Sequence, residues 1–428
     1  MTGTRTSMSI RTRRVSTART AGIMTLVAGG VLLFGVGCGG SGSSSSTQTT
    51  TTPPATTSSA NVLAISVDAG PDTAEPYANG AFASVIVCTP GTTTCQTIDG
   101  VLVDTGSSGL RLLSSVLTIS LPQQTANGNP VAECLPFVSG YTWGPVQTAD
   151  VELSGETANA VPIQVINGSA FTVPSACSNQ GAAENTLADL GANGILGVGN
   201  FVQDCGDACV STGASNPALY YQCVSSNCTV IGEPLAQQVA NPVASFAKDN
   251  NGVIIELPAV SAPEATLNGS LIFGIGTESN NALNGATIYP VDDFGNFITI
   301  FKTSSTTITN STSFIDSGSN GLYFFDSAQT GIPTCSDANF FYCPSSTENL
   351  SATTEGAGGT PSSTINFSVA NADALFNDNP TANVFEDLAG PNSISGFDWG
   401  LPFFYGRNVY TAIQGQTTPG GTGPYWAY

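Results

Sequence analysis

The chain contains no histidine among its 428 residues. This absence excludes a Ser-His-Asp triad, a Cys-His pair and any zinc site that depends on imidazole, because each of these needs a histidine side chain. Acid-base chemistry in this protein must therefore come from carboxyl groups.

Basic residues are also scarce. Nine Lys and Arg stand against thirty Asp and Glu, and five of the nine lie before residue 20. The remaining four are Arg111, Lys248, Lys302 and Arg407, which leaves a formal charge of −26 on the chain from residue 20 onward. So few scattered cations cannot form the basic surface that phosphate backbones require, and we expect no nucleic-acid partner.

The N-terminus predicts export. A basic region precedes an apolar stretch at residues 21–36, which is short and glycine-rich for a permanent membrane span. The small residues before Cys38 resemble a bacterial lipobox, although Gly35 stands where Leu is usual. We predict a signal peptide at residues 1–37, a lipidated Cys38 with a Ser/Thr-rich tether at 38–60, and a membrane-anchored lipoprotein that faces the periplasm or cell surface.

Ten cysteines remain when Cys38 is set aside, an even number that fits disulfide bonds in an exported protein. Cys88 with Cys95 and Cys335 with Cys343 are close enough in sequence for local pairs. The four cysteines at positions 205, 209, 223 and 228 also fit a four-thiolate zinc site. We favour disulfides, because the export signal implies an oxidising compartment.

Short runs rich in Val, Ile, Phe and Thr, separated by Gly, Pro, Asn and Asp, begin after residue 61. Such runs are typical of β-strands. They lie at residues 62–67, 82–88, 101–103, 161–166, 253–257, 271–273, 298–301 and 409–413. Helical periodicity is scarce, with the best candidate at residues 234–248 and shorter ones at 373–376 and 386–388. The sequence therefore predicts an all-β protein with a few short helices.

One phrase occurs twice, as VDTGSSGL at residues 103–110 and as IDSGSNGL at residues 315–322. Five of the seven positions from the aspartate onward are identical. A single Asp-Thr-Gly or Asp-Ser-Gly triplet is usually an ordinary β-turn, but these two are the only ones in the chain and each follows apolar residues. Asp104 and Asp316 lie about one domain's length apart, so the repeat predicts two carboxyls facing each other across a pseudo-twofold axis.

The residues around each aspartate suit a pair of carboxyls. The glycines permit a tight loop, the hydroxyls after them can hydrogen-bond a carboxylate oxygen, and the hydroxyls before them can lock the two loops together. These supporting residues are Thr105, Gly106 and Ser107 in the first copy and Ser317, Gly318 and Ser319 in the second. Two carboxyls held close together share one proton, so one can deprotonate a water while the other protonates a substrate carbonyl.

These residues resemble the catalytic loops of the pepsin-like aspartic proteases. In that family a later apolar-apolar-Gly strand crosses behind each loop, and Ile195-Leu196-Gly197 is similar to the first of these strands. The segment WGLPFFYGRNVY at residues 399–410 is similar to the second, while GSLIFG at 269–274 and TIYPV at 287–291 resemble the start of the family's C-terminal lobe. The likeness covers roughly residues 61–428, in the family's order.

The resemblance implies a bilobal fold of two β-barrel-like lobes around a central cleft. The N-terminal lobe would span residues 61–246 and the C-terminal lobe residues 247–428, with Asp104 and Asp316 as the catalytic dyad. The family's flap usually offers a Tyr followed by Gly, whereas this chain has Tyr141 and then Trp143 before a glycine. Either aromatic can serve as the flap residue, and either can be an ordinary packing residue. Arg111 stands where an aromatic is frequent, and we favour its pairing with a structural carboxylate over attraction of an acidic substrate.

Our leading hypothesis is a monomeric, lipid-anchored aspartic endopeptidase that acts on a peptide or protein substrate without a metal or other cofactor. The alternative is a catalytically inactive member of the fold that binds an extended peptide or a glycan in its cleft. A third hypothesis is a structural β-rich surface protein in which the repeat only records a duplication. The excess of acidic groups also predicts tolerance of mild acid, because self-repulsion eases as the carboxylates are protonated.

Overall fold

The computed structural model describes residues 59–169, 171–303, 307–336, 340–392 and 396–428. The predicted signal peptide, Cys38 and nearly all of the tether lie outside these residues. Across the described ranges, no helix is both long and apolar enough to cross a membrane.

Strands dominate the described chain, as the short β-branched and aromatic runs predict. The strands of the first half are β1 (Val62–Asp68), β2 (Gly80–Cys88), β3 (Cys95–Asp104), β4 (Ser108–Leu113), β5 (Thr125–Ala126), β6 (Asn129–Pro136), β7 (Gly140–Leu153), β8 (Glu156–Ile166), β9 (Ala182–Ala183), β10 (Gly194–Val198), β11 (Tyr220–Val224) and β12 (Asn227–Val230). Those of the second half are β13 (Gly252–Leu257), β14 (Leu267–Phe273), β15 (Ile288–Pro290), β16 (Phe297–Lys302), β17 (Thr307–Ile315), β18 (Leu322–Phe324), β19 (Glu348–Glu355), β20 (Ser362–Val369), β21 (Ala389–Pro391), β22 (Asp398–Trp399), β23 (Arg407–Ala412), β24 (Thr417–Thr418), β25 (Gly421–Thr422) and β26 (Tyr425–Ala427).

Helices are short throughout the described ranges. The α-helices are α1 (Ser175–Ser178), α2 (Leu187–Leu190), α3 (Ser327–Thr330) and α4 (Ala372–Asp378), and the 3-10 helices are η1 (Ser114–Val116), η2 (Gly206–Cys209), η3 (Leu235–Gln237), η4 (Pro242–Ser245) and η5 (Leu401–Phe404). The predicted helix at residues 373–376 is confirmed within α4. The one at 234–248 is wrong, because Pro242 disfavours a helical residue before it and the side chain of Asn241 instead caps the separate turn η4. The helix expected at residues 386–388 is also wrong, because residues 386 and 387 form a turn and Leu388 lies in no helix.

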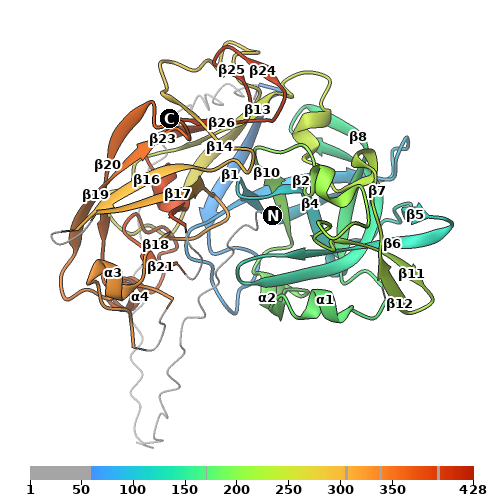
Figure 1. Ribbon diagram of the computed structural model, residues 1–428, viewed down its shortest axis with the longest axis horizontal. Coiled ribbons are helices and arrows are strands. Elements are labelled where there is room, and N and C mark those ends of the chain that lie inside the picture. Colours follow the sequence, from blue (N-terminus) through green and yellow to red (C-terminus); the bar gives the residue numbers. More distant parts are fainter. Residues whose placement is uncertain (1–58, 170, 304–306, 337–339, 393–395) are drawn as a thin grey trace, which may run out of the picture.

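Two β-rich lobes lie side by side, with β4, β7 and β8 in one and β16, β19 and β20 in the other (Figure 1). The second lobe is built on a seven-stranded sheet with the order β20-β19-β16-β17-β22-β18-β21. Strand β1 joins the halves of the chain, because it pairs with β2 on one side and with β14 on the other. The predicted all-β, two-lobed architecture with barrel-like sheets is confirmed.

The hydrophobic core runs through both halves of the chain. One large cluster of buried side chains includes Val103 and Leu196 from the first half and Ile315 and Trp399 from the second. All four belong to the strands that carry or cross behind the two repeated loops. The core therefore fixes these loops by packing on the residues next to them.

Five disulfides join the ten cysteines that follow Cys38, and they are typical of an exported protein. The predicted pairs Cys88–Cys95 and Cys335–Cys343 are confirmed. The remaining bonds are Cys134–Cys177, Cys205–Cys209 and Cys223–Cys228. The zinc alternative for the last four cysteines is wrong, because their sulfurs are bonded in pairs and offer no thiolate.

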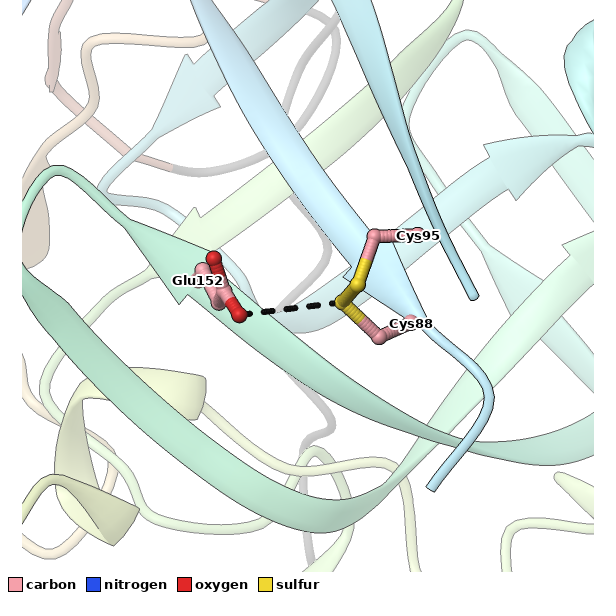
Figure 2. Close-up of side chains that lie close together, drawn as sticks. All are labelled: Cys88, Cys95 and Glu152. Atoms are coloured by element: carbon pink, nitrogen blue, oxygen red, sulfur yellow. Dashed lines mark hydrogen bonds between the residues drawn. A yellow bond between two sulfur atoms is a disulfide. The ribbon is translucent and has the colours of Figure 1, made fainter. Parts of the chain in front are cut away.

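A carboxylate approaches one of these disulfides. Figure 2 shows Glu152 of β7 beside the bond between Cys88 and Cys95, with its Oε1 atom 3.7 Å from the Sγ atom of Cys88. The two cysteines face each other across the ends of β2 and β3. Because both sulfurs are oxidised, the group cannot supply the thiolates that a metal ion would need.

Candidate active site

The two repeated loops occupy equivalent places in the lobes. Asp104 is the last residue of β3, and Asp316 directly follows β17. Strand β10 runs parallel to β3 and antiparallel to β4, so it passes between the two arms of the first loop. Strand β22 does the same between β17 and β18. Each aspartate is thus held at the point where three strands meet.

Glycines allow these crossing strands to touch the loops. A Cβ atom on Gly197 would lie 2.8 Å from the Oγ atom of Ser107, and one on Gly400 would lie 2.0 Å from the carbonyl oxygen of Gly321. Both distances are far below ordinary van der Waals contact. The apolar-apolar-Gly pattern therefore has a steric cause, since only a residue without a side chain fits behind each loop.

The two carboxyl groups have matching hydrogen bonds. Asp104 accepts the amide of Gly106 at 2.7 Å and the hydroxyl of Ser107 at 2.6 Å. Asp316 accepts the amide of Gly318 at 2.7 Å, and its Oδ2 atom lies 2.9 Å from the Oγ atom of Ser319. The side chains are buried, with 1% and 0% of their residues' surface exposed. Each carboxyl group therefore has donor groups at both of its oxygens.

Reciprocal hydrogen bonds lock the two loops together. The amide of Thr105 donates to the Oγ atom of Ser317 at 3.1 Å, and the amide of Ser317 donates to the Oγ1 atom of Thr105 at 3.0 Å. The Thr105 hydroxyl then donates to the carbonyl of Ile315 at 3.1 Å, and the Ser317 hydroxyl to that of Val103 at 2.8 Å. The bonds repeat about a pseudo-twofold axis and join residues 210–214 positions apart.

Gly106 brings the two aspartates into the same neighbourhood. Its amide binds the carboxylate of Asp104, while a Cβ atom on this glycine would lie only 2.6 Å from the Cγ atom of Asp316. The first loop therefore packs directly against the second carboxyl. Two acidic side chains on adjoining loops form an arrangement that can carry acid-base chemistry.

A third carboxyl group, which the sequence analysis missed, adjoins the second loop. The Oδ2 atom of Asp398 lies 2.7 Å from the Oγ atom of Ser319, and Asp398 is fully buried. A signal for it was present in the sequence. The strand behind the first loop places Ile195 two residues before its glycine Gly197, whereas the strand behind the second loop has Asp398 at the corresponding position before Gly400.

The aromatic residues proposed for the flap lie on β7 and are buried in a separate cluster. Trp143 packs edge-on against Tyr221, with ring centroids 5.4 Å apart, and Tyr141 belongs to the same cluster beside the Cys134–Cys177 disulfide. This is the environment expected for packing residues. A flap role for Tyr141 or Trp143 stays a prediction.

Arg111 forms a buried ionic cluster. Its Nη2 atom lies 2.9 Å from the Oε1 atom of Glu133 and 2.8 Å from the Oδ2 atom of Asp204, and the hydroxyl of Tyr220 donates to Asp204 at 2.7 Å. Burial, followed by the charge of Glu133, holds the pKa of Asp204 well above its usual range. The expected pairing of Arg111 with structural carboxylates is confirmed.

The fold and these contacts define a class: all-β, two-lobed proteins that bring one Asp loop from each lobe together. Residues 57–428 match the family described as "Protein of unknown function (DUF3443)", and the chain belongs to that family. No curated protein matches the chain. Among solved structures the chain is similar to the crystal structure of aspartic proteinase from Irpex lacteus, with 16% identity, a TM-score of 0.47, and coverage of 86% of this chain and 96% of that one.

Proposed function

We propose that this protein is an aspartic endopeptidase with Asp104 and Asp316 as its catalytic dyad. The observation that supports this most strongly is the reciprocal bonding of the two loops, in which Thr105 and Ser317 exchange equivalent hydrogen bonds. This bonding fixes the relative position of the two carboxyls. Such fixed placement is what acid-base catalysis by a carboxyl pair needs.

The proposed reaction uses the dyad in its singly ionised state. The charged aspartate takes a proton from a water molecule, which attacks the carbonyl carbon of the scissile peptide bond. The neutral aspartate gives its proton to the carbonyl oxygen, so a tetrahedral intermediate forms without a covalent bond to the enzyme. Proton transfer to the leaving nitrogen then breaks the C–N bond, and the dyad returns to one shared proton.

The test is cleavage of an unfolded polypeptide and of a peptide library by the full-length protein between about pH 3 and pH 7. We expect faster cleavage in acid and inhibition by statine-type transition-state analogues. Asp104→Asn and Asp316→Asn should each lower kcat/KM by at least 10²-fold, the lower end of what one acid-base group contributes. Asp293→Asn is the matched control, because this aspartate is exposed. Full activity in both dyad variants would exclude the proposal.

One observation favours the alternative of a catalytically inactive binding protein. Asp104 and Asp316 are almost completely buried, at 1% and 0% exposure, so little of the two carboxyl groups is open to a scissile bond. If the wild-type protein binds a statine peptide or a glycan by calorimetry but cleaves nothing in the library, the binding function replaces the enzymatic one. If it does neither, the remaining hypothesis is a structural surface protein.

For its location, the disulfides support export, and we propose that the protein is a lipoprotein anchored through Cys38. It would act as a monomer facing the periplasm or the cell surface, with a peptide or protein substrate and without nucleic acid. Fractionation should recover the wild type with the membranes and Cys38→Ser in the soluble fraction. A processed N-terminal peptide without a lipid mass would contradict the anchor, and a dimer in light scattering would contradict the monomer.

A further inference from the structure

The position of Asp398 is defined by the internal symmetry of the molecule. In the first lobe, Ile195 on β10 is the register partner of Leu102, two residues before Asp104. In the second, Asp398 on β22 is the register partner of Phe314, two residues before Asp316. Asp398 is therefore the counterpart of Ile195. Because an apolar side chain fills this position in one lobe, the fold does not itself require a carboxyl in the other.

Burying a carboxyl costs free energy unless it forms hydrogen bonds, so this departure from symmetry needs a chemical reason. The contact between Asp398 and Ser319 gives that reason. The Oγ atom of Ser319 lies 2.7 Å from the Oδ2 atom of Asp398 and 2.9 Å from the Oδ2 atom of Asp316. In the first lobe the equivalent hydroxyl of Ser107 donates to Asp104 at 2.6 Å. Only the second loop thus joins its aspartate to another carboxyl through a serine.

The number of protons limits how this serine can bond. A hydroxyl carries one hydrogen, and an ionised carboxylate only accepts. If Asp398 and Asp316 were both ionised, the single hydrogen of Ser319 could serve only one of its two short contacts. The other contact would then place two oxygen atoms close together with no hydrogen between them. A proton on one of the carboxyls turns both contacts into hydrogen bonds. The amide of Gly318 donates to the Oδ1 atom of Asp316 at 2.7 Å, so with Ser319 at Oδ2 both oxygens of Asp316 are in contact with donor groups. The proton then belongs on Asp398.

We propose that Asp398 is a positioning residue for the dyad. Its protonated carboxyl donates to Ser319, and the Ser319 hydroxyl in turn donates to the ionised Asp316. These two hydrogen bonds in series orient the hydroxyl proton of Ser319 toward Asp316. They also make the Ser319 hydroxyl a stronger donor, since hydrogen bonds in series polarise one another. The result is a lobe-specific aid to ionisation of Asp316 that Asp104 lacks. The role in catalysis depends on the proposed peptidase function, whereas the protonation of Asp398 does not.

Neighbouring titratable groups are consistent with this arrangement. Asp398 is paired in register with Tyr323 on β18, and Tyr77 lies near that tyrosine. Burial raises the pKa of Tyr323 well above its usual value, so the phenol stays neutral. Its hydroxyl donates to the Oδ1 atom of Asn320 at 2.6 Å. The hydroxyl proton of Tyr323 is therefore donated to Asn320 and is not the proton in the contact between Ser319 and Asp398.

The test compares two substitutions at this position. Asp398→Ile places the residue type of Ile195 in the second lobe and removes the donor to Ser319. The acid limb of the pH profile, which is the range where kcat/KM rises with pH, should therefore move to higher pH by on the order of half a unit. Asp398→Asn keeps a group that can donate to Ser319, so its limb should lie between those of the wild type and Asp398→Ile. In a Ser319→Ala background, Asp398→Ile should no longer move the limb. An ionised Asp398 predicts the opposite sign, because both substitutions would remove a negative charge and move the limb to lower pH. That result, or the same shift without Ser319, would overturn the proposal.

A second measurement separates this inference from the peptidase function. The infrared difference spectrum between the wild type and Asp398→Asn at pH 7 should contain the carbonyl stretch of a protonated carboxyl. The band supports the inference even if no peptide is cleaved, in which case only the proposed function fails. A difference spectrum that shows a carboxylate instead refutes the inference whatever the activity. Because Asp398→Asn is nearly isosteric, this comparison stays available if Asp398→Ile does not fold.

Discussion

Substitution of Gly106 by Ala tests the contact between the two Asp loops. The backbone of Gly106 has no positive φ, so an alanine is conformationally acceptable. Its Cβ atom would lie 2.6 Å from the Cγ atom of Asp316 and 2.7 and 2.8 Å from the two carboxylate oxygens. Carbon atoms in contact are about 3.5–4.0 Å apart, so the loop and the carboxyl must separate by roughly 1 Å.

This displacement sets the size of the expected effects. Overpacking by one methyl group costs about 1–3 kcal/mol of unfolding free energy. A catalytic group displaced by about 1 Å lowers the rate on the order of 10²-fold. We therefore expect Gly106→Ala to fold with a somewhat lower Tm and to lose most of its kcat/KM on an unfolded polypeptide at acid pH. Activity should fall much more than stability does.

The control is Gly358→Ala. No atom lies within 4 Å of a Cβ placed on Gly358, which is exposed and also has no positive φ. Its Tm and kcat/KM should match those of the wild type. If Gly106→Ala keeps both wild-type values, the close packing of the two loops is refuted. If its Tm falls while the wild type itself shows no cleavage, the geometry stands and the peptidase function does not.

Three other substitutions test buried polar groups. Thr105→Val leaves the amide of Ser317 without its buried acceptor, so urea denaturation should show a loss of about 1–3 kcal/mol, and an unchanged midpoint would contradict the interlock. Arg111→Met leaves the buried side chains of Glu133 and Asp204 without their cation and should cost about 3–5 kcal/mol of unfolding free energy in urea denaturation; an unchanged midpoint would speak against the ionic cluster. Burial raises the pKa of Glu233 to about 7, so the folded state binds this proton more tightly than the unfolded chain does. Its contribution to stability is present below about pH 4.5 and lost as the pH rises through 7, and Glu233→Gln should remove on the order of 2 kcal/mol of that pH dependence in unfolding experiments at pH 4.5 and 7.5.

Local sequence patterns predicted many of the strands and two of the disulfides. Seven of the eight short apolar runs fall wholly within strands, and the eighth, at residues 409–413, extends one residue beyond β23, because alternation and β-branched residues act over a few neighbouring positions. The neighbouring pairs Cys88–Cys95 and Cys335–Cys343 were also within reach of sequence reasoning. The helix expected at residues 234–248 failed because its apolar spacing could not outweigh the local effect of Pro242.

The sequence by itself determined that the protein is β-rich, that any acid-base chemistry has to come from carboxyls, and that Asp104 and Asp316 occupy equivalent places in a repeat. A repeat and an absent residue type can be read without knowing any contact. Only the tertiary structure decided the partners of Arg111 and the link from Asp398 to the dyad through Ser319. The physical reason is distance along the chain: Ser319 and Asp398 are 79 positions apart, and strand register, set by core packing across the whole lobe, brings them within hydrogen-bonding distance.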